Sequence, residues 1–171
     1  MSLSFYDASI PPLIRALTIL RSLLEKAEAH AAEQGIDPAV LTGARLAADM
    51  HPLTNQIQLA SDGAKGGGAR LAGIAAPSFA DTETSFAELK DRLNKTLDFL
   101  ATIKPEMVDG GEGKMVEVPT PGRTLTFTGR DFLFHFCLPN LYFHVVTAYG
   151  LMRAQGVAIG KIDYLAGPYG F

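Results

Sequence analysis

The chain has 171 residues, the length of one domain, and 47% of them are hydrophobic, which is enough for a sizeable core. Its 15 basic and 18 acidic residues give a net charge of −3 without a long run of either sign, which argues against a nucleic-acid partner. The N-terminus does not resemble a signal peptide, no apolar run reaches about 18 residues, and Cys137 is the single cysteine.

These features predict a single domain over residues 1–171, located in the cytoplasm and without a membrane partner. A lone cysteine also excludes an internal disulfide bond and a metal cage made of thiolates.

A long first helix is predicted over residues 6–34, because hydrophobic residues recur at spacings of three and four. The stripe consists of Leu13, Leu17, Leu20, Leu24 and Ala27. Pro11 and Pro12 lie near its beginning, where a missing N–H does least harm, and Gly35 is a natural stop. The pair Asp37-Pro38 then predicts a short helical turn to Leu41.

A second long helix is predicted over about residues 50–74, or from as early as residue 43. Its core stripe consists of Leu53, Ile57, Ala60 and Ala64. Gly63 and the run of glycines at 66–68 would each weaken an isolated helix by about 1 kcal/mol relative to alanine. Either the helix breaks there or a neighbouring element packs unusually close, and we expect a continuous helix.

The third helix is expected to begin at residues 81–84, a stretch rich in capping and acidic groups, and to run to Ile103. Its apolar residues follow a near-heptad spacing and comprise Phe86, Leu89, Leu93, Leu97 and Leu100. Pro105 closes this helix.

Residues 115–118 and 124–127 alternate apolar and polar side chains around a Pro- and Gly-containing turn, which predicts a small hairpin. Residues 128–131 resemble a capping start for a fourth helix that ends at Gly156. We expect the tail at 160–165 to be irregular and docked on the helices. The predicted fold class is therefore all-α, a four-helix bundle with a hairpin inserted before the last helix.

The fourth helix carries the best candidate for a site. Pro139 lies well inside it, where a proline removes a hydrogen bond and kinks a straight helix. Asn140, His144 and Thr147 share one face of this helix, and Tyr149 lies at a neighbouring angle. Such polar groups are costly to bury without partners or a ligand.

Two histidines of this helix do not make a simple metal pair. His135 precedes His144 by nine residues, which at about 100° per residue places the two side chains on opposite faces.

A second polar cluster precedes or opens the second helix and comprises Asp49, His51 and Gln56. If the helix is continuous through them, Asp49 and Gln56 face the core and His51 faces solvent. If it begins at Pro52, Asp49 and His51 lie at its start and point at the bundle end; a proline at the first helical position favours this alternative.

Three stretches of the sequence resemble an uncharacterised bacterial family. This family is classified as a domain of unknown function and is placed near the DinB/YfiT-like superfamily. The three stretches are residues 45–56, the pattern Pro-Asn-x-Tyr-Phe-His-x-x-Thr-Ala-Tyr at 139–149, and Gly-Lys-x-Asp-Tyr-Leu at 160–165. The resemblance implies a DinB-like four-helix bundle, often a homodimer. It also implies a divalent metal, zinc or nickel, held by one histidine of the second helix and a His-x-x-x-His pair of the fourth, and in some members thiol-dependent transfer.

This sequence departs from that pattern, because the fourth helix has no His-x-x-x-His pair. The matching metal ligands would be His51, Asn140 and His144, and an amide oxygen is a poor ligand for zinc.

Three functions therefore remain open. In the first hypothesis, a small molecule binds in a polar pocket that consists of Asp49, His51, Gln56, Asn140, His144, Thr147 and Tyr149. Alternatively, His51, Asn140 and His144 hold a metal in a degenerate thiol-dependent transferase. In the third hypothesis the polar face is an internal network in a non-catalytic homodimeric interaction module.

Overall fold

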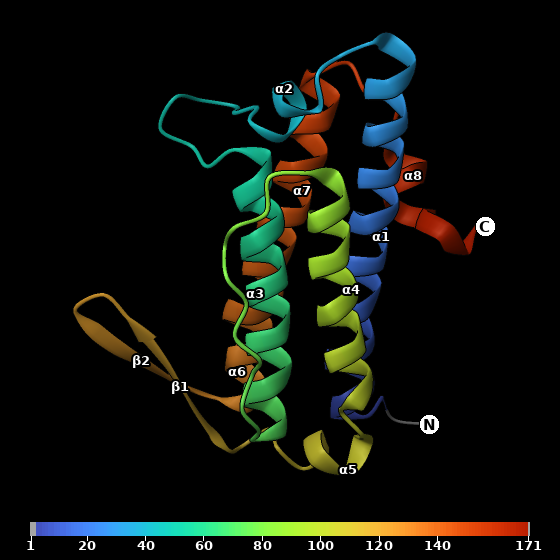
Figure 1. Cartoon of the computed structure of the whole chain (residues 1–171). Helices are drawn as coiled ribbons and strands as arrows, with labels where there is room; N and C mark the ends of the chain where they lie inside the picture. The colour runs from blue at the N-terminus through green and yellow to red at the C-terminus, as the bar shows by residue number, and fades with distance from the viewer. Residues whose placement is uncertain (1–2, 171) are drawn as a thin grey trace.

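The computed structural model describes residues 3–170, and its dominant elements are four long helices (Figure 1). They are α1 (Phe5–Gln34), α3 (Leu53–Ala72), α4 (Phe86–Thr102) and α7 (Leu138–Ala154). Helix α3 packs on α4 and α7, and α1 packs on α3, α4 and α7. The apolar stripes predicted for α1 and α3 are buried in the shared core, as are Leu89, Leu93 and Leu100 of α4. The chain is mostly helical, as predicted.

Shorter elements connect or cover these helices. They are α2 (Pro38–Thr42), α5 (Pro105–Val108), α6 (Gly129–Asp131), a π-helical segment (Phe132–Cys137), α8 (Lys161–Ala166) and a 3₁₀ turn (Gly167–Tyr169). Within residues 3–170, no helix is both long and apolar enough to cross a membrane.

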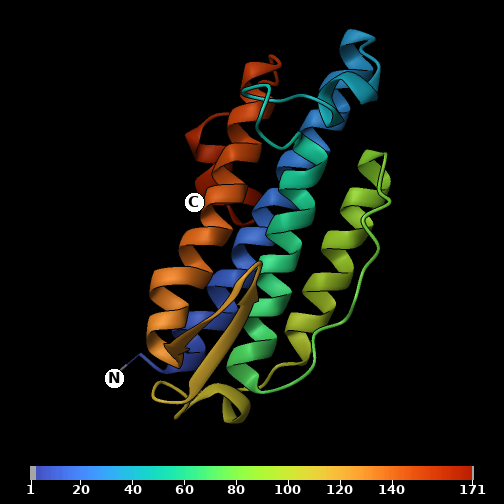
Figure 2. The ribbon, with the colours of Figure 1, turned by 90° about the vertical axis from the view of Figure 1, so that its left-hand side faces the viewer.

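The predicted hairpin is confirmed. Strand β1 (Met115–Thr120) pairs antiparallel with β2 (Arg123–Thr128), and the turn between them contains Gly122 at a φ of +84°. The hairpin projects to one side of the helices in Figure 1 and lies in front of them in Figure 2.

The beginnings of the helices show where capping signals predict well and where they mislead. Ser4 accepts a hydrogen bond from the backbone N–H of Asp7 at the start of α1. Helix α4 begins at Phe86, later than expected, because Ser85 and Glu88 form a reciprocal capping box. The acidic stretch before it, at 81–84, forms the loop that leads to this cap.

The glycine-rich part of α3 is a continuous helix, as predicted, and its neighbours pack unusually close. A Cβ atom on Gly67 would lie 2.3 Å from Sγ of Cys137, and one on Gly68 would lie 2.6 Å from Leu100. The glycines therefore allow α3 to approach α4 and the segment that leads into α7.

Pro139 is accommodated by π-helical turns rather than by a kink in a straight α-helix. The backbone N–H of Leu138 donates to the carbonyl of Leu133, five residues earlier. Pro139 then falls in the first turn of α7, where an N–H is not required. The helical path nevertheless runs from Gly129 to Ala154, two residues short of the predicted end at Gly156.

The tail after residue 160 is helical, so the prediction of an irregular segment is wrong. The backbone N–H of Gly160 donates to Oδ2 of Asp163 at 2.6 Å, and Asp163 also pairs with Lys26 of α1. Arg15 donates to the carbonyl of Leu165 at 2.6 Å. A local cap and two contacts with α1 thus order a segment that the sequence pattern presents as a loop.

Candidate functional site

His144 of α7 is buried and hydrogen-bonded across to α3. Its Nδ1 lies 2.8 Å from Oε1 of Gln56, and Nε2 of Gln56 donates to the backbone carbonyl of His51 at 3.2 Å. Because Nε2 is the donor of the Gln56 amide, its Oε1 must accept, so Nδ1 of His144 carries the proton. The other ring nitrogen, Nε2, is then left with a free lone pair.

The electrostatic surroundings keep His144 neutral. Burial, and to a smaller extent the positive charge of nearby His51, lowers the pKa of His144 below its ordinary value of 6.5. The ring edge packs against Phe143, with centroids 5.3 Å apart. At neutral pH the side chain is therefore an uncharged imidazole that can accept a hydrogen bond or a proton.

Asn140 and Thr147 lie one turn before and one turn after His144. Nδ2 of Asn140 would be 3.3 Å from a Cβ on Gly63, so this half-buried side chain lies against the backbone of α3. The hydroxyl of Thr147 donates to the carbonyl of Phe143 at 2.7 Å and is satisfied within its own helix.

Tyr149 makes its contacts elsewhere. Its ring meets Tyr164 of α8 edge-on, with centroids 6.0 Å apart. Helical rotation of about 100° per residue places Tyr149 roughly 140° from His144.

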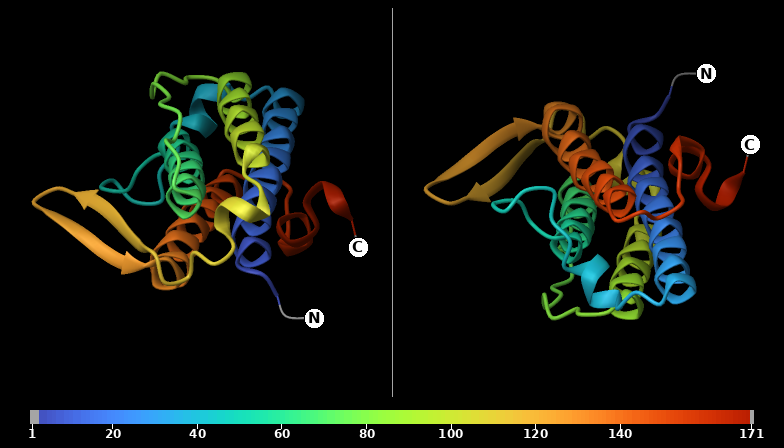
Figure 3. Two further views of the ribbon diagram at one scale, coloured as in Figure 1. Left: turned by 90° about the horizontal axis from the view of Figure 1, so that it is seen from below. Right: turned by 90° about the horizontal axis from the view of Figure 1, so that it is seen from above.

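Asp49 and His51 lie in the segment that leads into α3. The helix begins at Leu53 with Pro52 at its cap, so it is not continuous through Asp49 and His51, and its start lies one residue after the predicted start at Pro52. Both side chains are exposed. His51 takes part in the hydrogen-bond network of His144 and Gln56 through its backbone carbonyl oxygen, which accepts from Gln56. In Figure 3, this segment (residues 43–52) and the hairpin project to the same side of the molecule.

The donor set for a metal differs from the three histidines that the resemblance implies. Within residues 3–170, no group of three or more His, Cys, Asp or Glu side chains is placed to share a metal ion. His135 is exposed and lies 3.9 Å from Asp131. The groups near this network that could bind a metal are the imidazoles of His51 and His144 and the amide oxygen of Asn140.

The structure also reveals a charged cluster that the sequence analysis missed. The side chain of Arg92 is 1% exposed and pairs with Asp62 at 2.7 Å, Asp81 at 2.9 Å and Glu83 at 3.0 Å. Helical spacing could have indicated it, because Arg92 lies three residues after buried Leu89 and so shares the apolar stripe of α4.

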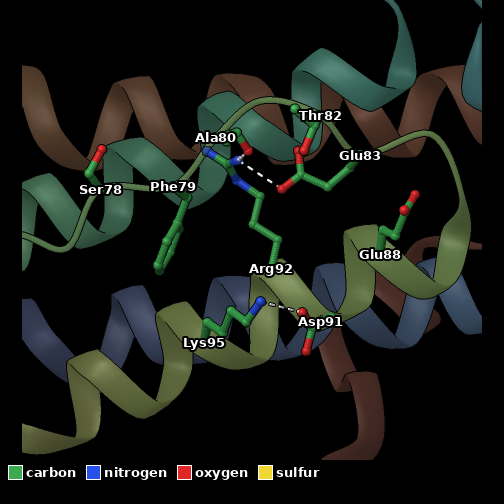
Figure 4. Close-up of a pocket in the computed structure, with 9 residues that line it drawn as sticks. All are labelled: Ser78, Phe79, Ala80, Thr82, Glu83, Glu88, Asp91, Arg92 and Lys95. Carbon is green, nitrogen blue, oxygen red and sulfur yellow. Dashed lines mark hydrogen bonds and ion pairs between the residues drawn. The ribbon is translucent and has the colours of Figure 1, made fainter.

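The Arg92 cluster lines a cavity of about 350 Å³ between α4 and the loop that precedes it (Figure 4). Its walls are formed by Ser78, Phe79, Ala80, Thr82, Glu83, Glu88, Asp91, Arg92 and Lys95. Burial opposes ionisation of Glu83, but hydrogen bonds from Gln58 and Arg92 lower its pKa overall. The Arg92 charge is therefore matched inside the protein, and the cluster holds the loop at 74–85 against α4.

The fold places the protein in the DinB-like class. A crystal structure of a DinB family member protein from Shewanella denitrificans has 39% sequence identity to this chain and a TM-score of 0.84. The match covers 94% of this chain and 90% of the Shewanella chain.

The chain belongs to the DUF1993 family, a domain of unknown function whose match extends over residues 5–165. The resemblance drawn from the three sequence stretches is thereby confirmed. None of the curated proteins matched the chain.

Proposed function

We propose that the polar face shared by α3 and α7 binds a small organic molecule, with His144 as the central polar contact. The observation that carries this proposal is the Gln56 bond to Nδ1 of His144, at 2.8 Å. It leaves Nε2 as an acceptor of known tautomer, next to the amide of Asn140 one turn away. Binding sites of this kind combine an apolar wall with a few oriented polar groups, and the exposed ring of Phe143 of α7 offers apolar surface nearby.

In this proposal α1, α3, α4 and α7 form a four-helix bundle of the DinB kind. Their mutual packing supports this description, and the remaining short helices cover its ends and sides. Bundles commonly build sites from side chains on facing helices, as Gln56 and His144 do here.

The second candidate is a degenerate metal site for a divalent ion such as zinc or nickel. Support comes from Gln56, since histidines that bind metal usually direct their other ring nitrogen to a hydrogen-bonding partner. His51 and His144, with the amide oxygen of Asn140, would hold the ion. When bound, it would supply a Lewis acid for a thiol-dependent transfer.

The third candidate is a non-catalytic homodimeric module. Three exposed apolar side chains support it: Leu46 is 48% exposed, Phe143 57% and Val146 51%. We call these three residues the α7 patch, because Phe143 and Val146 lie about one turn apart on α7 and Leu46 lies 3.9 Å from a Cβ on Gly150, one turn further along this helix. Large exposed apolar groups that lie together are typical of interaction surfaces.

One experiment separates the first two candidates. Untagged protein is dialysed exhaustively, its metal content is measured, and a small-molecule library is screened by thermal shift with and without a chelator. We expect compounds that raise the Tm of the wild type in the presence of chelator and do not raise that of H144N. The matched control is H135N, because His135 is exposed and lies outside the network.

About one zinc or nickel per chain, lost in H144N, would instead support the metal site. Absence of metal together with absence of any stabilising compound would contradict both candidates and favour the homodimeric module.

A further inference from the structure

A second cavity lies where α8 packs against α1 and α7. It has a volume of about 250 Å³, and Arg15, Ala16, Tyr142, Val145 and Tyr164 contribute to its walls. An adjoining, more open cavity of about 530 Å³ shares two of these residues, Arg15 and Tyr142. The two tyrosines come from two different stretches that carry the family resemblance, and the His144 site uses neither of them.

The walls of the inner cavity are mainly apolar, with three polar groups. Burial raises the pKa of Tyr142, against a smaller opposite effect of the Arg15 charge, and burial also raises the pKa of Tyr164. Both hydroxyls are therefore protonated at neutral pH and available as donors. Within residues 3–170, neither hydroxyl makes a hydrogen bond to another residue.

Among the described residues that line this cavity, Arg15 alone carries a charge. One of its terminal nitrogens donates to the carbonyl of Leu165 at 2.6 Å, and the guanidinium lies 5.0 Å from the centroid of the Tyr169 ring. No carboxylate within the described part of the chain forms an ion pair with it. Since a guanidinium has five donors, most of its capacity remains for an anion. Asp7 lines the adjoining cavity of about 530 Å³ and is not part of the wall of the inner cavity.

The roof of the cavity is held in a defined position. Asp163 of α8 pairs with Lys26 of α1, and a Cβ on Gly167 would lie 2.8 Å from Ile19. Glycine at position 167 thus lets the tail lie directly on α1, and the cavity persists beneath α8 as part of the fold.

We propose that this cavity binds a small monocarboxylate with an apolar or aromatic body. The carboxylate pairs with Arg15 and accepts from the hydroxyls of Tyr142 and Tyr164, while the body contacts Ala16 and Val145. This site is distinct from the His144 site, because Tyr142 precedes His144 by two residues and so faces about 200° away around α7. The proposal does not depend on the function proposed above.

The test compares charged and uncharged probes of the same shape. Benzoate and octanoate are titrated into the full-length protein by calorimetry, with benzyl alcohol and 1-octanol as the uncharged partners. Tyrosine fluorescence gives a second readout, because the chain contains no tryptophan. We expect the carboxylates to bind the wild type at least about ten-fold more tightly than the alcohols, as a charge-assisted contact requires.

Four variants assign the binding to this cavity. R15Q is expected to reduce carboxylate affinity at least about ten-fold without changing the affinity for the alcohols. Y142F and Y164F each remove one hydroxyl and are expected to reduce carboxylate affinity about three- to ten-fold. A16M fills the cavity and is expected to abolish binding of all four probes, whereas the control H135N, at an exposed position outside both sites, leaves every affinity unchanged.

Several outcomes overturn the proposal. They are absence of carboxylate binding at millimolar concentration, equal affinity of R15Q and the wild type, or loss of binding in H135N. Circular dichroism and thermal unfolding show whether R15Q and A16M are folded; if they are not, the two conservative tyrosine variants decide the question.

Discussion

The hydrogen bond between Gln56 and His144 sets the tautomer of His144, whereas burial is the main cause of its neutral charge. Replacing Gln56 with glutamate puts a carboxylate opposite Nδ1, which should raise the pKa of His144 because a negative neighbour favours the imidazolium. Histidine NMR titration of the wild type should show a pKa for His144 below the ordinary value of 6.5. In Q56E it should lie above the wild-type value; an unchanged pKa would contradict the assigned contact. H135N simplifies the spectrum without touching the network.

The closeness of Gly67 and Cys137 is a second feature that single substitutions can test. G67A should lower the free energy of unfolding by about 2 kcal/mol, because the added methyl overlaps Sγ of Cys137 by more than the better helix propensity of alanine offsets. The double variant G67A/C137A should lose less stability than the sum of the two single variants. Urea unfolding measures all three; strictly additive effects would mean that these atoms are not in contact.

At the scale of elements, Arg92 joins α3, α4 and the loop between them. R92A leaves the carboxylate of Glu83, 12% exposed, without its cation, and should lower the free energy of unfolding by about 3 kcal/mol. It should also make the loop at 74–85 more sensitive to limited proteolysis. The matched control is K95A on the same helix, whose ion pair with Asp91 is 61% exposed on both sides and should contribute less than about 1 kcal/mol. Equal effects of the two variants would show that the cluster does not hold the loop.

For the whole molecule, the lowered pKa of buried His144 predicts a loss of stability in mild acid. Its folded pKa lies below the unfolded value, so the unfolded chain binds more protons between the two values. The free energy of unfolding should therefore be fully present above about pH 6.5 and fall as the pH decreases toward the folded pKa. Denaturant unfolding from pH 7.5 to 5 should show this slope in the wild type and a smaller slope in H144N. An identical slope in H144N would contradict the prediction.

The α7 patch predicts the oligomeric state. We expect a homodimer by light scattering and sedimentation, and we expect V146E to shift it toward monomer, because a charge on an apolar interface is costly to desolvate. The control is K95E, which places the same charge on the exposed side of α4 and should leave the oligomeric state unchanged. A wild type that is monomeric at high micromolar concentration would contradict this expectation.

The sequence by itself determines the long helices, the hairpin and the family, because these depend on local periodicity, turn residues and short motifs. The spacing of Leu13, Leu17 and Leu20 is enough to predict α1, and the alternation around Gly122 is enough to predict the hairpin. Capping residues were less decisive. Residues 81–84 include several possible N-caps, but Ser85 is the N-cap of α4 because it forms a capping box with Glu88.

Only the tertiary structure shows which polar residues meet. It pairs Gln56 with His144 across 88 positions and gathers Asp62, Asp81 and Glu83 around Arg92. It also orders α8 through contacts with Lys26 and Arg15 of α1. Such pairings depend on the rotation and offset of packed helices, and the pattern along one helix does not contain that information.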